Sequence, residues 1–195
     1  EAYTLEAGLR VEQTDVTYTV PEENIYYDTG DAYHYFEIFP NLKLTRTVGS
    51  SMRSIAAYNR RIDRPTEQEL RIFPKYDDPE LLKVGNPYLR PQLTQVIELG
   101  LNRPWWKGSA TVSAYHRDIT DAFQRIYAID NTNPNYDIIN KLYQNVGRAK
   151  QTGIHLVADQ QLAPSWRVAG SVNWYVHDID SISTTLQFPT ERPFF

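Results

Sequence analysis

The sequence predicts an all-β protein, an antiparallel up-and-down meander that forms part of a transmembrane β-barrel of the outer-membrane type. Three observations lead to this prediction. Apolar and polar residues alternate, tryptophans bracket one apolar face, and the connections between alternating segments are short and long in turn. The clearest alternation covers residues 166–176, where every second residue is apolar or glycine. This period of two is typical of a β-strand with one apolar and one polar face.

Two tryptophans mark the ends of this apolar face. Trp166 and Trp174 lie eight residues apart, which corresponds to roughly 21 Å along the barrel axis at about 3.4 Å per residue and a tilt of about 40°. The apolar band of an outer-membrane barrel is about 25 Å tall and is edged by aromatic girdles. We therefore expect Trp166 and Trp174 to be girdle residues. Trp105 and Trp106, in a predicted turn, fit such a girdle better than the alternative of stacking on a sugar.

The same alternation recurs along the chain. It predicts strands near residues 3–14, 35–46, 51–62, 91–103, 108–119, 150–162 and 165–177, with an eighth candidate near 183–188. The connections 47–50, 104–107 and 163–164 are short, whereas 15–34, 63–90 and 120–149 are long. Outer-membrane barrels sort their connections in this way, with the long loops outside the cell, whereas Greek-key sandwiches mix both ends. We expect a wholly antiparallel sheet in which strands adjacent in sequence are neighbours.

Alternation also assigns side chains to two faces of the sheet. One face is expected to carry Leu9, Leu99, Val112, Leu156 and Val172. The opposite face is expected to carry Arg10, Glu98, Thr111 and Arg167. Polar residues that face the barrel interior or its mouth are the candidates for ligand contact; they are Arg10, Glu98, Arg61, Arg64, Arg117, Arg167, Asn173 and His177.

Two long connections contain local order. Residues 65–70 suit the start of a helix, with Pro65 at its first position and acidic residues in its first turn. Residues 123–129 and 136–142 flank a segment rich in turn formers, which predicts a hairpin beyond the membrane. The arginines Arg60, Arg61 and Arg64 could bind an anion at the mouth. Pairing with Asp63, Glu67, Glu69 or loop carbonyls is the favoured interpretation.

Composition and motifs exclude several classes of function. The 195 residues include no cysteine, and the net charge of −4 offers no basic footprint for nucleic acid. The mean hydropathy is −0.54, too low for transmembrane helices. The four histidines lack zinc-ligand spacing, and the acidic pairs match no calcium loop. No nucleophile elbow, phosphate loop or dinucleotide fingerprint occurs, although the two carboxylates of a glycosidase would leave no spacing signature. We expect neither an enzyme, nor a metal site, nor a cofactor.

An ordered series of motifs resembles a known family. It comprises Tyr58-Asn59-Arg60-Arg61-Ile62-Asp63-Arg64-Pro65, then Gly85-Asn86-Pro87-Tyr88-Leu89-Arg90-Pro91 and Ile97-Glu98-Leu99-Gly100, with weaker matches at Leu5–Glu12, Phe39–Leu42, Asn145–Gly147 and Gly153. The series resembles the C-terminal barrel of TonB-dependent outer-membrane receptors, in particular the outer membrane protein beta-barrel family of Bacteroidetes-type bacteria. Residues 71–74 and Gln92 depart from the family pattern. We expect Gly85 to adopt a positive φ, and Pro87 and Pro91 to fix extended backbone.

The resemblance implies a location and partners. It implies a receptor in the bacterial outer membrane that contacts lipid, holds an N-terminal plug domain in its lumen and receives energy through TonB. Its cargo would be a scarce nutrient of the siderophore, cobalamin, glycan or peptide class. Seven or eight strands are too few for a plugged barrel of roughly 22 strands. Residues 1–195 are therefore expected to be one segment of a barrel domain whose plug and remaining strands lie outside this sequence. The alternative is a soluble antiparallel β-protein that binds carbohydrate through loop aromatics.

Overall fold

Seven long strands form one antiparallel sheet. The computed structural model describes residues 2–22, 30–49, 51–72, 75–78, 81–83, 85–130 and 138–179. The sheet consists of β1 (Tyr3–Tyr18), β2 (Asp31–Val48), β3 (Met52–Asp63), β6 (Gln92–Trp105), β7 (Gly108–Thr120), β10 (Arg148–Ala163) and β11 (Trp166–Ile179). They lie side by side in this order, each pair antiparallel, which confirms the meander. The eighth candidate strand lies outside the described residues.

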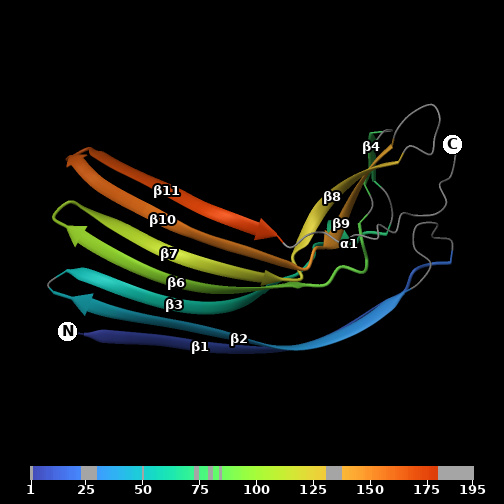
Figure 1. Ribbon diagram of the computed structural model, residues 1–195, viewed down its shortest axis with the longest axis horizontal. Coiled ribbons are helices and arrows are strands. Elements are labelled where there is room, and N and C mark those ends of the chain that lie inside the picture. Colours follow the sequence, from blue (N-terminus) through green and yellow to red (C-terminus); the bar gives the residue numbers. More distant parts are fainter. Residues whose placement is uncertain are drawn as a thin grey trace.

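The connections are sorted by length, as predicted. The sheet is curved, with its tight turns at one end and its long connections at the other (Figure 1). We call these the turn end and the loop end. The turn β6–β7 consists of Trp106 and Lys107 alone. The turn β2–β3 contains Gly49 with φ of 66°, a left-handed conformation that glycine adopts without steric cost. Trp105, which we expected in a turn, is instead the last residue of β6.

The strands β1 and β2 extend further toward the loop end than expected. Their pairing continues to Tyr18 opposite Asp31, whereas the sequence predicted strands only over 3–14 and 35–46. Beyond the apolar band both faces of a strand meet water, so polar and apolar residues no longer need to alternate. The sequence signal therefore ends before the hydrogen-bonded ladder does.

A second, small sheet lies at the loop end. It contains β4 (Lys75–Asp78), β5 (Leu81–Lys83), β9 (Ile138–Asn145) and β8 (Phe123–Asp130), in this order. The predicted hairpin is confirmed as the antiparallel pair β8–β9. The expectation of a wholly antiparallel structure is wrong here, because β5 and β9 are parallel. These two strands come from different long connections, so no tight turn fixes their relative direction.

A short helix, α1 (Glu67–Leu70), precedes this sheet. Its N-cap is Thr66, so Pro65 stands before the cap and not at the first helical position as predicted. The backbone N–H of Thr66 donates to Glu69 Oε2 at 2.6 Å. Glu69 is the N3 residue, so its carboxylate accepts from the N-cap backbone as in a capping box. The backbone of Gly85 lies directly against the end of this helix. A Cβ at Gly85 would lie 2.5 Å from the backbone nitrogen of Arg71. Gly85 is thus needed for close backbone approach; among the described glycines, positive φ occurs only at Gly49 and Gly147.

The strand register divides the sheet into two faces. One row of facing residues crosses all seven strands; it consists of Leu5, Leu44, Ala56, Leu99, Ala114, Ile154 and Trp174. This face, which we call the apolar face, also carries Leu9, Val112, Leu156 and Val172, as predicted. Arg10, Glu98, Thr111 and Arg167 lie on the opposite face, which we call the polar face.

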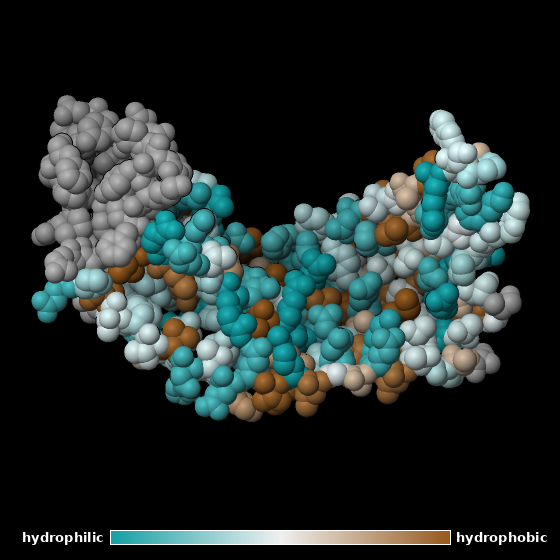
Figure 2. All heavy atoms as spheres, turned by 180° about the vertical axis from the view of Figure 1, so that it is seen from behind, coloured by the Kyte–Doolittle hydropathy of each residue, from teal (hydrophilic) through white to brown (hydrophobic). Residues whose placement is uncertain are grey.

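Burial on these two faces is the reverse of that in a water-soluble protein. Leu99 and Val172 on the apolar face are 61% and 65% exposed, whereas Thr94 and Tyr115 on the polar face are 1% and 7% exposed. In Figure 2, hydrophilic side chains run across the middle of the molecule and hydrophobic ones gather along its lower margin. Side chains on the polar face are packed more closely than those on the apolar face, which indicates that the polar face is the concave side of the curved sheet. An apolar face without cover requires an apolar solvent.

The two faces predict opposite effects for a charge placed at one depth. Val172 lies on the apolar face between the levels of Trp166 and Trp174, and its neighbour Ser171 lies on the polar face. Val172→Arg should lower the free energy of unfolding in lipid by about 2–4 kcal/mol. Ser171→Arg should cost much less, because its guanidinium stays hydrated. Equilibrium unfolding in lipid vesicles measures both costs, and equal costs would contradict the assignment of faces.

Close packing at Gly153 leads to a second prediction. A Cβ at Gly153 would lie 2.7 Å from the Trp174 carbonyl oxygen and 2.8 Å from the Tyr115 hydroxyl, whereas a Cβ at Gly170 would meet nothing within 4 Å. Gly153→Ala should therefore destabilise the barrel by about 1–3 kcal/mol through overpacking. Gly170→Ala is the matched control and should be neutral. The same unfolding measurement tests the pair, and a Gly153→Ala variant as stable as the control would refute this packing.

Candidate functional site

The polar face is the part of the molecule that carries ionic chemistry. Acids and bases on neighbouring strands pair along it, as at Glu6–Lys43, which face each other in the register with 3.0 Å between oxygen and nitrogen. Arg60 stands in a row of the apolar face, but it lies beyond the last β2–β3 pair and reaches Glu37 of the polar face at 2.6 Å. Much of the charge on this face is therefore neutralised by ion pairs between its own side chains. The polar groups without a partner are the better candidates for contact with a ligand or another domain.

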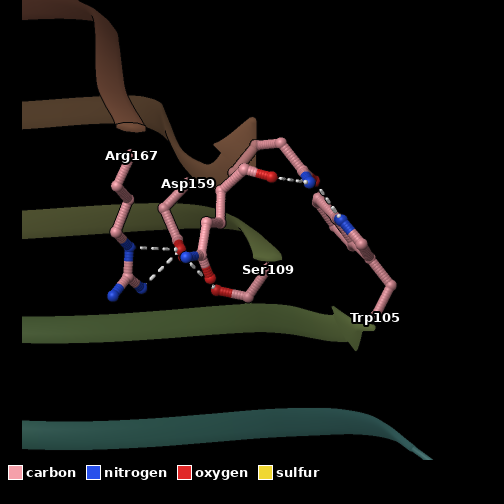
Figure 3. A network of polar contacts seen from close by, with 6 residues as sticks. Trp105, Ser109, Asp159 and Arg167 are labelled. Carbon is pink, nitrogen blue, oxygen red and sulfur yellow. Dashed lines mark hydrogen bonds and ion pairs between the residues drawn. The ribbon is translucent and has the colours of Figure 1, made fainter. Parts of the chain in front are cut away.

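At the turn end, a polar network surrounds Asp159 (Figure 3). Ser109 Oγ donates to Asp159 Oδ1 at 2.7 Å, and Arg167 Nε donates to Asp159 Oδ2 at 3.1 Å. Three strands thus meet at one carboxylate on the polar face. Arg167, predicted to face the interior, lies there but is held by this acid. On the apolar face nearby, Trp105 Nε1 donates to Gln160 Oε1 at 2.5 Å.

In the middle of the face, Tyr115 joins two further predicted residues. Its side chain crosses β10 at Gly153, and its hydroxyl donates to Asn173 Oδ1 at 3.0 Å. The guanidinium of Arg117 lies 4.8 Å from the centre of the Tyr115 ring and donates to Gln151 Oε1 at 3.1 Å. The sequence analysis predicted Arg117 and Asn173 but missed Tyr115. The available signal was Gly153, which opposes both Tyr115 and Tyr175 in the register.

Toward the loop end, arginines lie against aromatic rings and share a carboxylate. Arg10 is 4.6 Å from the centre of the Phe39 ring and 3.1 Å from Glu12. Arg64 donates to the Tyr35 hydroxyl at 3.0 Å and pairs with the same Glu12. Arginine over a ring is both a cation–π contact and a rigid donor platform. The structure thus brings the predicted Arg10 and Arg64 together.

Arg90 extends this arrangement. Its guanidinium pairs with Asp31 and lies 4.0 Å from the centre of the Tyr33 ring. Its backbone is clamped by Asn145, whose Oδ1 accepts from the Arg90 N–H and whose Nδ2 donates to the Arg90 carbonyl, both at 2.9 Å. The sequence analysis placed Arg90 at the end of a long connection and did not include it among the candidates for ligand contact. The contacting partners lie more than 50 residues away in the chain, so no local pattern indicated them.

Two donors here lack a partner within the part of the chain that the structure describes. They are Arg90 Nη1 and the Tyr18 hydroxyl, both atoms shielded from solvent. Burial raises the pKa of Tyr18 to about 12, and the nearby Asp31 carboxylate acts in the same direction. The hydrogen bond from Arg90 lowers the pKa of Asp31. The hydroxyl therefore remains a donor and the carboxylate remains ionised at neutral pH. We call Arg10, Arg64, Arg90, Tyr18, Tyr33 and Tyr35 the mouth cluster.

The remaining predicted residues lie apart from the mouth cluster. Arg61 lies 3.8 Å from Asp63, the predicted partner. Arg60 pairs with Glu37 on β2 and Arg64 with Glu12 on β1, not with Glu67 or Glu69 as expected, because β1 and β2 run past the end of β3. Glu67 pairs with Arg71 at 3.0 Å. Glu98 and His177 lie on the polar face without hydrogen-bond or ion-pair partners among the described residues.

Other site types find no support in the described residues. No group of three His, Cys, Asp or Glu side chains among them is placed to hold a metal ion. No helix in the described ranges is long and apolar enough to cross a membrane. Trp166 and Trp174 lie on the apolar face, 70% and 66% exposed, and Trp106 is 88% exposed. Their role as girdle residues stays a prediction.

Comparison with known proteins identifies the family. The family model described as "Outer membrane protein beta-barrel family" matches residues 1–192. Among solved structures, the copper transporter OprC superposes with a TM-score of 0.64 at 17% identity over 92% of this chain and 27% of that chain. The FrpB iron transporter from Neisseria meningitidis (F5-1 variant, apoprotein) gives 0.57 at 14% identity over 92% and 24%. The siderophore receptor PirA from Pseudomonas aeruginosa gives 0.52 at 16% identity over 76% and 27%.

No curated protein matches the chain. The chain spans about a quarter of the length of the solved structures named above. The family match excludes the alternative of a soluble β-protein and agrees with the uncovered apolar face. The chain belongs to the outer membrane protein beta-barrel family and forms part of a barrel wall in the bacterial outer membrane.

Proposed function

We propose that the chain is one segment of the barrel domain of a TonB-dependent receptor that imports a scarce nutrient. The plug domain and the remaining strands belong to other parts of the same protein. The similar structures are transporters of copper and iron and a siderophore receptor, which supports import as the function. The observation that carries the proposal is the arginine-rich, aromatic wall at the loop end of a polar face, opposite a face built for lipid. Cationic and aromatic side chains side by side are the chemistry of a binding wall.

The mouth cluster favours an anionic ligand with planar groups. Each of its arginines already contacts a carboxylate, so the cluster would bind an anion through donors without a partner, not through excess charge. Arg90 Nη1 and the Tyr18 hydroxyl have no partner among the described residues; both atoms are shielded from solvent in the free protein, so binding must expose them. Tyr33 and Tyr35, whose ring centres are 6.4 Å apart, add flat apolar surface beside them. Among the nutrient classes considered, an anionic siderophore fits this chemistry best; cobalamin, a glycan or a peptide would be distinguished by the uptake assay below.

The polar face between the turn end and its centre suits contact with a plug. Toward the turn end, charges pair within the sheet at Asp159 and at Glu6, and at the centre Tyr115 contacts both Arg117 and Asn173. Such a wall can be covered by another domain without leaving many buried charges unpaired. Glu98 and His177 are the exceptions, and we assign them to contacts with the plug.

Uptake tests this proposal. In the full-length receptor, Arg90→Gln should raise the half-saturating concentration of the imported anion by roughly ten-fold, because a hydrogen bond from a charged group is worth about 1.5–3 kcal/mol. Growth of the deletion strain on candidate nutrients identifies the cargo, and radiolabelled uptake measures the variant. Arg71→Gln removes an exposed ion pair with Glu67 outside the cluster and should leave uptake unchanged. Uptake that persists in a strain without TonB would contradict the proposal.

Titration of Tyr18 tests the mouth cluster independently of transport. The difference between the ultraviolet titrations of the native protein and Tyr18→Phe should show one phenol with a midpoint near pH 12. Since the folded pKa lies above the ordinary value of about 10, folding favours the neutral phenol. This contribution to stability is fully present below pH 10 and is lost as pH rises through about 12. A midpoint near 10 would show that the hydroxyl is not buried as described.

A further inference from the structure

The segment 85–91 lies between α1 and the start of β6 and belongs to neither sheet. Its first residues are fixed by their own backbone, because the N–H groups of Gly85 and Asn86 donate to carbonyl oxygens at the end of α1, at 2.8 and 2.6 Å. Toward its other end lies Arg90 of the mouth cluster, and the following Pro91 has no N–H with which to enter a ladder. The backbone of Arg90 is held by a side chain instead.

Asn145, the last residue of β9, provides this support. Its Oδ1 accepts from the Arg90 N–H and its Nδ2 donates to the Arg90 carbonyl oxygen, both at 2.9 Å. A facing residue in an antiparallel ladder exchanges the same two hydrogen bonds with its backbone. Nδ2 also donates to the Asp121 carbonyl oxygen at 2.7 Å. The amide therefore uses its acceptor and both of its donors, a set that among short side chains only asparagine offers.

The Asn145 side chain projects from a well-packed corner, where β7 passes into β8 and β9 into β10. The N–H of Val146 donates to the Ala122 carbonyl oxygen at 2.6 Å, and the N–H of Ala122 donates to the Gly147 carbonyl oxygen at 3.1 Å. Ala122, Val146 and Ala149 form a buried hydrophobic cluster at this corner. Such packing restricts local motion, so the clamp on the Arg90 backbone has a firm anchor.

The two ends of Arg90 are thus held by different parts of the fold. Its backbone is bound to Asn145, and its guanidinium pairs with Asp31 and lies 4.0 Å from the centre of the Tyr33 ring on β2. An arginine side chain is long and has many rotamers, and ordering such a side chain opposes binding. Fixing the backbone leaves the guanidinium few alternative positions before an anion arrives.

We propose that Asn145 is a positioning residue for the anion that the mouth cluster binds. It acts through Arg90 and does not touch the anion: it holds the Arg90 backbone, so that the guanidinium starts from one position on the Tyr33 ring. This inference rests on the function proposed for the mouth cluster and adds to it a residue from outside the cluster. Removal of the amide should therefore weaken binding without slowing the transport of a bound nutrient.

Chemical modification of Arg90 tests its position without any nutrient. Phenylglyoxal reacts with accessible guanidiniums, and peptide mass spectrometry of the full-length receptor in vesicles gives the rate at each arginine. In Asn145→Leu, Arg90 should react about three-fold faster or more, since the loss corresponds to at least one neutral hydrogen bond. Arg10 and Arg64 in the same sample should keep their native rates. An unchanged rate at Arg90 would overturn the proposal.

Asn86→Leu is the matched control within the same segment. The Nδ2 of Asn86 donates to the Tyr143 carbonyl oxygen and its Oδ1 accepts from a backbone N–H of the segment, both at 2.9 Å. The fully buried Leu89 lies between this site and Arg90, so Arg90 should keep its native reactivity in this variant. Equal acceleration in both variants would show that Asn145 only holds the segment together, and would overturn its role as a positioning residue.

Uptake tests the consequence for binding, with the radiolabelled ferric siderophore that supports growth in the assay above. Asn145→Leu should raise the half-saturating concentration about three- to ten-fold at an unchanged maximal rate. In the Arg90→Gln background the same substitution should have no further effect, because the group on which it acts is already removed. A further rise of the half-saturating concentration in that background would contradict action through Arg90.

Two arrangements keep the outcomes distinct. Asn145→Ser, whose hydroxyl is too short to meet both the N–H and the carbonyl of Arg90, carries the same expectations where Asn145→Leu does not reach the membrane. If Arg90→Gln itself leaves uptake unchanged, the function proposed for the mouth cluster fails. The reactivity of Arg90 toward phenylglyoxal then still decides whether Asn145 holds it in position.

Discussion

The structure depends on one continuous antiparallel hydrogen-bonded sheet from β1 to β11, whose register shifts only near the β10–β11 turn, between Gln161 and Ala163, in the described strands. In a hydrocarbon solvent no water can satisfy the backbone, so each strand must pair along its length with its neighbour. Once the register is set, the side-chain period of two distributes every residue to lipid or to the interior, and a slip of one residue would exchange the two faces. The row from Leu5 to Trp174 shows how strictly this holds across seven strands. The apolar band and the ion pairs both follow from it.

The sequence predicted those features that depend on the period of two. The seven strands, the assignment of Leu99 and Val172 to the apolar face, and the short turns all follow from alternation within one segment. The features it missed depend on contacts between distant segments. Arg90 meets Asp31 across 59 residues, and the parallel pair β5–β9 joins two different long connections. Beyond the apolar band no solvent requires alternation, so the loop ends of β1 and β2 left no signal either.

The tilt of the strands explains why the apolar band is not level with the rows of the register. The register row that contains Trp174 on β11 contains Leu5 on β1. The apolar residues of β1, however, continue from Leu5 toward the loop end as far as Val11. Strands in a barrel run at an angle to its axis, so a line of constant depth crosses the rows obliquely. The difference in position of the apolar band between β1 and β11 is therefore expected from the stagger of tilted strands in a barrel. In the proposed barrel, the same edges, β1 and β11, would be paired by the remaining strands, because an open edge in hydrocarbon leaves backbone groups unsatisfied.

Two aromatic side chains fasten the sheet, one on each face. Tyr115 crosses β10 at Gly153 to reach Asn173 on the polar face, and Trp105 crosses β7 at Gly108 to reach Gln160 on the apolar face. In both cases the aromatic ring lies over a glycine of the neighbouring strand and supplies the packing that a glycine side chain cannot. The polar atom of the ring then forms a hydrogen bond with a residue of the strand beyond that neighbour. Each contact is possible in only one register. The glycines therefore do not weaken these strands; they provide the positions at which three strands are held in alignment, and that alignment determines which residues lie on the polar face and which face the lipid.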